Sequence, residues 1–462
     1  MDDKAVIIAR QQRQIEELLA LVAQLRDEIA RLKNQNSSNS SKPPSSDIVN
    51  PQPRIKRKKR RRGGQSGHRR CQRQLLPPEQ VDETILHELP ADEVQRRRLV
   101  PLDEYEPTLQ QIHLPKKLIY VTEHHVRLYQ TPTGRIVKAK LPGEIRKAGL
   151  FAPPLQAMAG YLKARCHMSY STLRDCLAEV FGLPVSEGYL AKVCTKSLST
   201  ALQPAYAEAA TRIRNAAVLG TDETGHNDAG QLHWVWCQQD REAAFFHISD
   251  SRGSKVLRKI LGKDFDGVLQ CDYFSANKKY IQDYSIPVQY CWAHLIRDIK
   301  SLGESLYDSV RRWSDGLLQI AKKIFRVWKS RSERPRWENT LQTLKKVFMQ
   351  KMRKPPDYGD AHTLAKRFRG RSGEQSYFLF LEVPGVEPTN NRTEQAIRHV
   401  VIDRRVTQGT RSDAGMRFCE RAWTVIATCV RQSRSVYQFF LHALKATLNP
   451  SLPYPTLIPV NP

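Results

Sequence analysis

The sequence is short of acidic residues relative to basic ones. It contains 47 Asp and Glu against 74 Lys and Arg, which gives a formal net charge of +27. An excess of this size excludes a near-neutral metabolic enzyme as the default interpretation. It favours a polyanionic partner, with nucleic acid ahead of a membrane surface.

Long apolar runs and paired cysteines are also missing. No stretch approaches the roughly 18 apolar residues of a membrane span, and Met1-Asp2-Asp3 lacks the layout of a signal peptide. The nine cysteines are scattered, with no two closer than ten residues. This spacing predicts reduced thiols in a cytoplasm instead of a disulfide framework, and it provides no Cys-x-x-Cys pair for a zinc knuckle.

The first 36 residues carry a heptad pattern and are predicted to form a coiled-coil dimerisation arm. β-Branched residues recur at position a and leucines at position d, a combination that favours a parallel two-stranded coil. The alternative is an amphipathic helix that lies on its own protein body. The residues expected at the dimer contact are Ile15, Leu18, Val22, Leu25, Ile29 and Leu32.

A Ser/Pro-rich linker, residues 37–53, precedes a basic segment, residues 54–79. Residues 54–73 hold eleven positive charges and no acid, so the segment repels itself unless it meets an anion. Phosphate contacts with DNA are the expected role, and a solvated disordered tail is the alternative. The DNA-binding residues expected here are Arg57, Lys58, Lys59, Arg60, Arg61, Arg62 and His68.

Residues 80–150 are predicted to form a small β-containing module without chemistry of its own. Short strand-like runs alternate there with prolines. The runs are Ile112–Leu114, Leu118–Thr122 and His125–Tyr129.

Residues 151–212 are predicted to be helical. Pro153-Pro154 opens the segment, and Ser171-Thr172 and Ser186-Glu187 are candidate caps. On so basic a protein this unit can be interpreted as a DNA-binding, helix-turn-helix-like module. A pair of scaffold helices is an equally good interpretation.

From residue 216 onward, short buried runs alternate with helices in the order β-β-β-α-β-α-β-α. The first strand ends at Thr221-Asp222-Glu223, and the fourth ends at Asp272. This order matches the ribonuclease-H-like α/β fold, in which the first and fourth strands are neighbours, so Asp222 and Asp272 are expected to converge. The predicted strands are Ala216–Gly220, Leu232–Cys237, Ala244–Ile248, Val268–Cys271 and Val288–Cys291, with helices over Ser251–Leu261 and from Trp292.

A third carboxylate is expected on a helix that crosses the same sheet edge. Residues 301–375 have helical spacing throughout and predict an inserted all-helical subdomain. After it, Glu394 lies in the first turn of a further predicted helix, with Arg398 one turn on.

Four motifs carry a resemblance to a known family. Asp222-Glu223-Thr224, the strand end at Asp272, Cys291-Trp292-Ala293-His294 and Asn390-Asn391-x-x-Glu394-x-Ala396-x-Arg398 resemble the DDE transposases of the insertion-sequence 66 family, third open reading frame type. The coil, the linker, the Lys/Arg-Gly-Gly-Gln-x-Gly-His segment and the helical unit extend the resemblance over most of the chain.

The resemblance implies a transposase that binds the terminal inverted repeats of its element and carries out 3′-end cleavage and strand transfer. It implies double-stranded DNA as partner, a homodimer or higher assembly, and small accessory proteins of the same element. It also implies a bacterial cytoplasmic, nucleoid-associated protein without a membrane partner.

The same resemblance implies that Asp222, Asp272 and Glu394 form the catalytic and metal-binding triad. Two Mg²⁺ ions, with Mn²⁺ as a substitute, would be shared: Asp222 bridges both, and Asp272 and Glu394 each hold one. Mg²⁺ prefers hard oxygen ligands and leaves room for water and phosphate, so three carboxylates suffice. The attacking group would be water for end cleavage and the freed 3′-hydroxyl for strand transfer.

Each triad residue also has an ordinary structural interpretation. Asp222 and Glu223 could be ordinary acids at a strand end. Strand alternation places them on opposite faces, so they cannot both point into the site, and Glu223 is the residue most easily mistaken for the first carboxylate. Asp272 could cap the next helix. Glu394 could occupy the third position of a capping box that starts at Asn391.

Other residues near the triad have two interpretations. Trp292 and His294 could contact DNA or order the site, or could form a packed aromatic–histidine core. The arginines that follow Glu394 are interpreted as a DNA track beside the metals, against scattered surface charge. They are Arg398, Arg404, Arg405, Arg411, Arg417 and Arg421.

The chain departs from the family pattern in two places. Family members often carry a Cys-x-x-Cys zinc module after the Gly-His segment, but here only Cys71 lies before residue 166. No zinc is therefore expected, and residues 80–150 would be a degenerate, metal-free equivalent. Tyr273 also stands where the family often has Gly.

Two other functions stay open: a dimeric sequence-specific DNA-binding regulator on an inactive transposase scaffold, and a ribonuclease-H-type nuclease or resolvase. The predicted fold class is multidomain: a coiled coil, small β-containing and helical DNA-binding modules, and a ribonuclease-H-like α/β catalytic domain with a helical insertion. The remaining expected boundaries are 213–300 for the first part of the catalytic domain, 376–434 for its remainder and 435–462 for a C-terminal tail.

Overall fold

The computed structural model describes residues 3–36, 39–40, 75–102, 109–115, 117–333 and 335–459. The chain divides into two compact units, Arg54–His125 on the one hand and Met1–Pro53 with Val126–Pro462 on the other. The DNA contacts expected from Arg57 to His68 lie outside the described residues, as does most of the linker.

The larger unit is built around a five-stranded mixed sheet with the strand order β5-β4-β3-β6-β7. The first three strands in sequence form an antiparallel meander, and β6 and β7 run parallel to β3. Three helices follow β5, β6 and β7 in turn, so the predicted order of elements is confirmed. The elements are β3 (Val218–Asp228), β4 (Gln231–Gln239), β5 (Ala244–Ser249), α9 (Ser254–Leu261), β6 (Val268–Cys271), α10 (Ser275–Tyr284), β7 (Val288–Tyr290) and α11 (Trp292–Leu302).

Strand β3 is longer than predicted. It does not end at Glu223 but continues to Asp228, because β4 pairs with it along its full length from Gly220. The turn follows at Ala229 and Gly230, whose φ angles of 49° and 88° are those of a tight two-residue hairpin turn. Asp222 therefore lies within β3 and not at its end, and pairing with Cys237 of β4 holds its backbone in place.

Helix α17 (Asp413–Arg431) covers the outer edge of β5 with polar side chains. Its side chains at every fourth position accept hydrogen bonds from every second N–H of the strand. The spacing of the acceptors along the helix matches the spacing of the N–H groups along the strand, because four helical residues rise about 6 Å and two strand residues about 6.8 Å. The bonds join Ile248 N to Glu420 Oε1 (2.6 Å), Phe246 N to Thr424 Oγ1 (3.1 Å) and Ala244 N to Thr428 Oγ1 (3.1 Å).

The helices of residues 151–212 share the core of the sheet. Ala205, Ala209 and Ile213 of α8 are fully buried in it. Helix α4 starts at Pro153, as predicted, and Ser186 caps α6, whereas the cap of α5 is Ser169 instead of Ser171. The elements are α4 (Pro153–Ala164), α5 (Tyr170–Phe181), α6 (Glu187–Lys192), the π-helical η3 (Val193–Leu198), α7 (Ser199–Ala201) and α8 (Gln203–Arg214).

The C-terminal segment expected as a tail contains a packed helix, α18 (Val436–Leu448). Phe439, Phe440 and Leu444 on this helix are buried, and the helix packs against α4. The apolar spacing of the segment explains the difference, because a stripe of this kind needs a partner surface.

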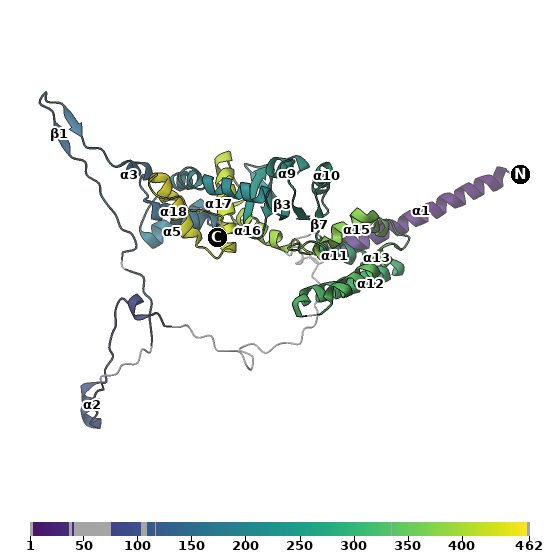
Figure 1. Cartoon of the computed structure of the whole chain (residues 1–462), viewed down its shortest axis with the longest axis horizontal. Helices are drawn as coiled ribbons and strands as arrows, with labels where there is room; N and C mark the ends of the chain where they lie inside the picture. The colour runs from purple at the N-terminus through teal and green to yellow at the C-terminus, as the bar shows by residue number, and fades with distance from the viewer. Residues whose placement is uncertain are drawn as a thin grey trace. The chain divides into compact units, whose positions relative to one another are not determined.

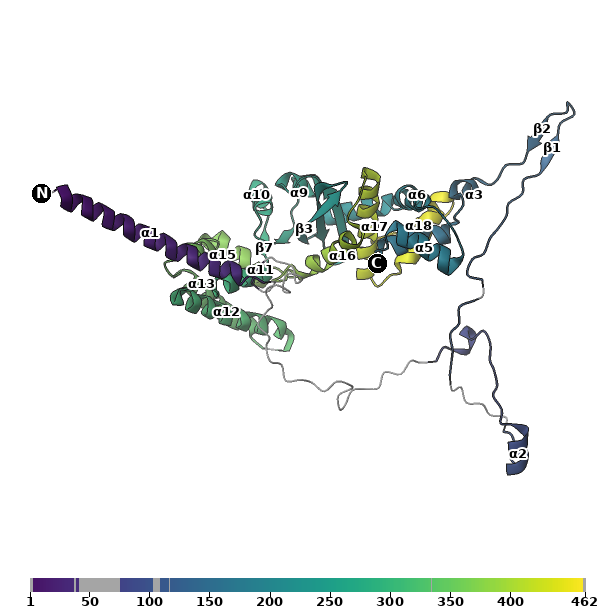
Figure 2. The same ribbon diagram turned by 180° about the vertical axis from the view of Figure 1, so that it is seen from behind.

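The insertion between α11 and α16 (Asn391–Thr407) is helical, as predicted. Helices α12 and α13 run side by side in both views of the molecule (Figures 1 and 2). Aromatic side chains fill the interior, among them Trp292 against Phe348 and Phe378. The elements are α12 (Asp308–Lys329), η4 (Arg331–Glu333), α13 (Trp337–Met352), α14 (Gly359–Lys366), α15 (Gly370–Phe378) and η5 (Leu379–Leu381).

Residues 80–150 contain less β structure than expected. The runs Ile112–Leu114 and Leu118–Thr122 are not strands, and only the end of the third run is one. The two strands form a single hairpin, visible in Figure 2. Their residues are all exposed, because no apolar surface among the described residues covers either face. The elements from residue 75 to 150 are η2 (Pro78–Gln80), α2 (Ala91–Arg97), β1 (Leu128–Gln130), β2 (Ile136–Lys138) and α3 (Gly143–Ala148).

The predicted N-terminal helix is present as α1 (Asp3–Lys33). It contacts the insertion through Asp27, which accepts hydrogen bonds from Ser305 Oγ at 3.0 Å and from Tyr358 Oη at 2.5 Å. Arg31, one turn on, hydrogen-bonds Tyr358 at 2.8 Å and pairs with Asp360. No described helix has both the length and the apolar composition that a membrane span requires.

Candidate active site

Strands β3 and β6 bring Asp222 and Asp272 to the same level of the sheet. The strands are parallel and in register from Val218 opposite Val268 to Gly220 opposite Gln270. Asp222 and Asp272 each lie two residues beyond this last pair. The expected convergence of these two aspartates follows from this register.

The Asp222 carboxyl lies among negative charges in a partly buried position. Burial raises its pKa well above the usual value, and the charges of Glu223, Asp272 and Glu394 raise it further. A hydrogen bond from the Glu223 backbone N–H to Asp222 Oδ1, at 3.0 Å, opposes this shift. Carboxylates that repel one another in this way are held together by the fold, and a bound cation would relieve the repulsion.

Asp272 is fixed by two hydrogen bonds to the same oxygen. Its Oδ1 accepts from Asn277 Nδ2 at 2.9 Å and from the backbone N–H of Phe274 at 3.1 Å. The N-cap residue of α10 is Phe274, so Asp272 braces the entry to this helix from two residues upstream without being its cap. Asn277 is fully buried and keeps the orientation of the carboxylate.

Glu223, the acid next to Asp222, has a different environment. Arg252 donates to its Oε1 from Nε at 3.0 Å and from Nη2 at 2.7 Å. The guanidinium in turn stacks over Trp234 and Phe274. Burial and the charge of Asp272 raise the pKa of Glu223, although Arg252 opposes this shift. An ion pair of this kind already uses the charge of Glu223.

The N-terminus of α16 places Glu394 next to β3. Asn390 joins three elements: its Nδ2 donates to Thr221 O at 2.8 Å, its N–H to Cys291 Sγ at 3.2 Å, and its Oδ1 accepts from Thr393 Oγ1 at 2.7 Å. Gly220 permits this approach, because a Cβ there would lie 2.2 Å from Thr393 Oγ1 and 2.7 Å from Asn390 Oδ1.

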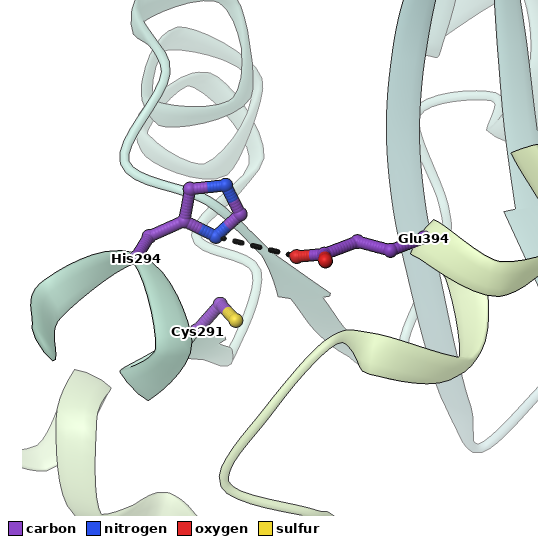
Figure 3. A group of neighbouring side chains, drawn as sticks. All are labelled: Cys291, His294 and Glu394. Carbon is purple, nitrogen blue, oxygen red and sulfur yellow. Dashed lines mark ion pairs between the residues drawn. The ribbon is translucent and has the colours of Figure 1, made fainter. Parts of the chain in front are cut away.

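The capping-box interpretation of Glu394 is wrong. The N-cap residue is Asn390 and the helix begins at Asn391, so Glu394 is the fourth residue of the helix instead of the third. Its side chain points away from the helix start and toward α11 (Figure 3). A capping box therefore does not explain the glutamate at this place.

Three side chains surround Glu394: Cys291, directly before α11, and His294 and Arg297 on α11. His294 Nδ1 lies 3.6 Å and Arg297 Nη2 3.5 Å from Glu394 Oε1, and Figure 3 shows the imidazole facing the carboxylate. Arg297 Nη2 also lies 3.0 Å from His294 Nε2. Burial and Arg297 lower the pKa of His294. Glu394 Oε1 and His294 Nδ1 are buried without a hydrogen-bond partner among the described residues.

Trp292 and His294 separate into two roles. Trp292 is fully buried and donates from Nε1 to Tyr377 O, so the packed-core interpretation holds for it. His294 faces the carboxylates. Cys291, the N-cap of α11, is buried, and burial raises the pKa of its thiol to about 11.

The arginines after Glu394 do not form one uniform track. Arg404 Nη1 donates to Thr224 Oγ1 at 2.9 Å and to Gly225 O, which ties α16 to β3. Arg417 binds Glu420, and Arg421 binds the Ser199 carbonyl. These contacts explain three of the arginines by structure. The exposed ones are Arg398, Arg405 and Arg411.

Sequence reasoning missed the residues that hold the carboxylates in place. Gly220, Arg252, Asn277 and Arg297 gave no signal, since their partners lie far away in the chain. Asn390 was noted only as part of a motif. The Cys-x-x-His spacing of Cys291 and His294 was the one local pattern that could have pointed to the environment of Glu394.

Two protein families match the chain. The family described as Transposase IS66 family matches residues 148–418, more than half of the chain and a range that includes all three candidate carboxylates. A family of unknown function (DUF6444) matches residues 3–74. No curated protein matches.

Proposed function

The chain belongs to the IS66 family of transposases, and from this premise we propose that it cuts and joins DNA with Asp222, Asp272 and Glu394. The observation that carries the proposal is the electrostatic coupling of the three carboxylates. They come from β3, the residue after β6 and α16, and the charges of Asp272 and Glu394 act on Asp222 together with that of Glu223. Asp222 and Asp272 form no ion pair among the described residues, and Arg297 lies 3.5 Å from Glu394, whereas Arg252 holds Glu223 at 2.7 Å.

The fold supports the proposal. A five-stranded sheet of order β5-β4-β3-β6-β7, with three antiparallel strands followed by two parallel ones, is the arrangement expected of a ribonuclease-H-like domain. Strand β6 ends at Cys271, and Asp272 directly follows it at the level of Asp222 in the longer strand β3. The charge of Glu394, on α16, acts on Asp222 there.

The carboxylates fit the divalent metal that the family suggests. A hard cation such as Mg²⁺ or Mn²⁺ is bound by oxygen ligands, which all three carboxylates provide. The carboxylates also repel one another, and Glu394 Oε1 has no hydrogen-bond partner in the described structure. We propose that Asp222, Asp272 and Glu394 hold two such ions. When bound, they activate the attacking oxygen and stabilise the leaving one.

The chain's own residues keep this carboxylate set in position. Asn277 orients Asp272, and Asn390 with Thr393 fixes the start of α16 against β3. Arg398, Arg405 and Arg411 are exposed on or directly after α16, and we propose that they contact DNA phosphates beside the site. The attacking oxygen is water for end cleavage and the freed 3′-hydroxyl for strand transfer.

We also propose that α1 joins two copies of the chain. The heptad residues Ile15, Leu18, Val22, Leu25, Ile29 and Leu32 are 44–60% exposed. Asp27 and Arg31, which contact the insertion, occupy heptad positions f and c on the opposite side of the helix. Within the described structure the apolar stripe therefore does not pack on the chain's own body, and a second copy can cover it.

The dimer is tested by solution mass. Leu18→Glu with Leu25→Glu should halve the mass in light scattering, because both charges enter the a/d seam. Arg10→Glu with Arg26→Glu, outside the a and d positions, is the matched control and should keep the dimer mass. An unchanged mass in the leucine variant would reject the coil as the main contact.

The catalytic proposal is tested on the cloned element with its flanking DNA. Purified protein and Mg²⁺ should produce discrete 3′-hydroxyl ends at the paired inverted repeats, mapped by primer extension. Asp222→Asn, Asp272→Asn and Glu394→Gln should each reduce cleavage by more than the roughly 10–100-fold that loss of an outer-shell partner costs. DNA binding in a gel-shift assay should persist.

Glu223→Gln is the matched control. It removes a carboxylate next to Asp222 but one that Arg252 already neutralises, so cleavage should fall far less. Equal losses in Glu223→Gln and Glu394→Gln would reject the assignment. Sequence-specific binding without cleavage in the wild type would favour the regulator, and cleavage of branched or hybrid substrates alone would favour the nuclease.

A further inference from the structure

Cys291, His294 and Glu394 combine a thiol, an imidazole and a carboxylate at one place. Their candidate ligand atoms all lie within 4.8 Å of one another. Cys291 and His294 are separated by one turn at the start of α11, and Glu394 reaches toward them from α16 (Figure 3). This is a different donor set from the all-oxygen set that includes Asp222 and Asp272.

The polar atoms of this cluster are only partly used. The 3.6 Å between His294 Nδ1 and Glu394 Oε1 is too long for a hydrogen bond, and both atoms are buried without a partner in the described structure. Cys291 Sγ accepts from the backbone N–H of Asn390 at 3.2 Å. Burial raises the pKa of this thiol, so the metal must displace the thiol proton to bind the thiolate, which is the form that binds metals.

We propose that Cys291 Sγ, His294 Nδ1 and Glu394 Oε1 bind a thiophilic divalent cation of the Zn²⁺ class, and that this ion inhibits the enzyme. Zn²⁺ takes such ligands at about 2.0–2.3 Å in a tetrahedron, so the donor atoms must approach to about 3.3–3.8 Å from one another. Mg²⁺ does not use sulfur or imidazole well and stays with the carboxylates. The thiol proton goes to solvent as the metal–sulfur bond forms.

The inhibition rests on the proposed function, because Glu394 would be shared between two sites. A carboxylate bound to the thiophilic ion is drawn toward α11 and away from Asp222 and Asp272. The Cys-His-Glu site is separate from any zinc module in the N-terminal region. The missing Cys-x-x-Cys pair there therefore does not bear on it.

Arg297 opposes the binding of this ion. It donates to His294 Nε2 at 3.0 Å, which requires the ring proton to sit on Nδ1, the atom that must be free to bind metal. Its charge also lies 3.5 Å from Glu394 Oε1. Arg297→Gln removes the charge and offers an acceptor for a proton on Nε2, so it should tighten metal binding about 10-fold or more, or 1.4 kcal/mol.

Cobalt spectroscopy tests the site independently of activity. Co²⁺ titrated into the metal-free full chain should give one equivalent with a thiolate-to-cobalt charge-transfer band and the visible bands of a tetrahedral ion, both displaced by Zn²⁺. The charge-transfer band should disappear in Cys291→Ser and persist in Cys271→Ser, a matched buried thiol at the end of β6. His294→Gln and Glu394→Gln should weaken the visible bands.

A gain of affinity in Arg297→Gln cannot come from misfolding and keeps the test decisive if a cysteine variant is unstable. A charge-transfer band that survives Cys291→Ser, or an Arg297→Gln protein that binds Co²⁺ no more tightly than the wild type, would overturn the proposal.

The inhibition is measured as the ratio of Mg²⁺-dependent cleavage rates with and without one equivalent of Zn²⁺. In the wild type, Zn²⁺ should slow cleavage at least 10-fold, so the ratio should be 0.1 or less. In Cys291→Ser the ratio should return toward one. A cobalt site without this inhibition would overturn the regulatory part. Absence of cleavage at any metal concentration would instead count against the proposed function and leave the cobalt result standing.

Discussion

Two glutamates of this protein, Glu420 and Glu394, have the same kinds of neighbours at different distances. Each lies on a helix that packs on the central sheet, and each has a histidine and an arginine beside it. Glu420 lies 2.9 Å from His247 and 2.6 Å from Arg417, and it accepts the backbone N–H of Ile248 at 2.6 Å. The corresponding distances of Glu394 to His294 and Arg297 are 3.6 and 3.5 Å.

The difference separates a structural glutamate from a candidate functional one. Glu420 is 1% exposed and both of its oxygens are used, because a buried charge without partners would destabilise the fold. Glu394 is 34% exposed and its Oε1 makes no hydrogen bond in the described structure. Residue types alone do not distinguish the two clusters, whereas the distances and the unused oxygen do.

The largest expected effect is on stability at Glu420. Glu420→Ala leaves His247, Arg417 and the N–H of Ile248 without their acceptor, which should lower the free energy of unfolding by about 3–5 kcal/mol. Chemical denaturation of the full chain measures it. Glu420→Gln keeps an oxygen for Ile248 and should lose less. A Glu394→Ala protein destabilised as strongly as Glu420→Ala would break the comparison.

The sequence was sufficient for much of the fold, for physical reasons. Buried alternating runs of apolar residues between turn signals gave the order of strands and helices. Asp222 and Asp272 were recognisable because they follow such runs, and Val268–Cys271 matches β6 residue for residue.

The sequence was not sufficient where contacts are long-range. The length of β3 depends on pairing with β4, and the burial of α18 depends on α4, neither of which is visible locally. Isolated β-type runs such as Leu118–Thr122 failed to become strands because no partner covers them. The environments of Glu420 and Glu394 differ through residues far away in the chain, so local motifs could not separate them.

A smaller effect is expected at Gly220, which sets the distance between α16 and β3. Gly220→Ala places a methyl group 2.2 Å from Thr393 Oγ1, so the start of α16 must move outward. Such overpacking should cost about 1–3 kcal/mol and reduce cleavage, because Glu394 moves with the helix. Both are measured on the same protein preparation, by denaturation and by the cleavage assay.

Gly225→Ala is the matched control on the same strand. Its added Cβ would have its nearest neighbours at 3.7 Å, an ordinary contact. Thr393→Ala in the Gly220→Ala background removes the closest atom and should restore part of the stability. If Gly220→Ala cleaved DNA as well as Gly225→Ala, the close approach of α16 would not matter for the site.

The smallest expected effect is a slight gain in stability when Glu394 is neutralised. This gain contrasts with the large loss of stability expected at Glu420. The pKa of Asp222 is raised in the folded chain, partly by Glu394. A raised carboxyl pKa means that ionisation weakens the fold as pH rises above the unfolded value of about 3.9, so at pH 7 the cluster costs stability. Glu394→Gln removes one of the repelling charges. The gain should be only about 0.5 kcal/mol, because Glu394 is partly exposed and Arg297 loses an ionic neighbour.

Magnesium provides the second half of this measurement. A cation that binds only the folded chain raises its melting temperature, and the stabilisation grows with the logarithm of the ratio of cation concentration to Kd. It relieves the same repulsion that Glu394→Gln removes. Mg²⁺ should therefore raise the Tm of the wild type and of Glu420→Gln, and raise it much less in Glu394→Gln. The variant would then melt above the wild type without Mg²⁺ and below it with Mg²⁺. A constant order of the two melting temperatures would show that Glu394 is as structural as Glu420.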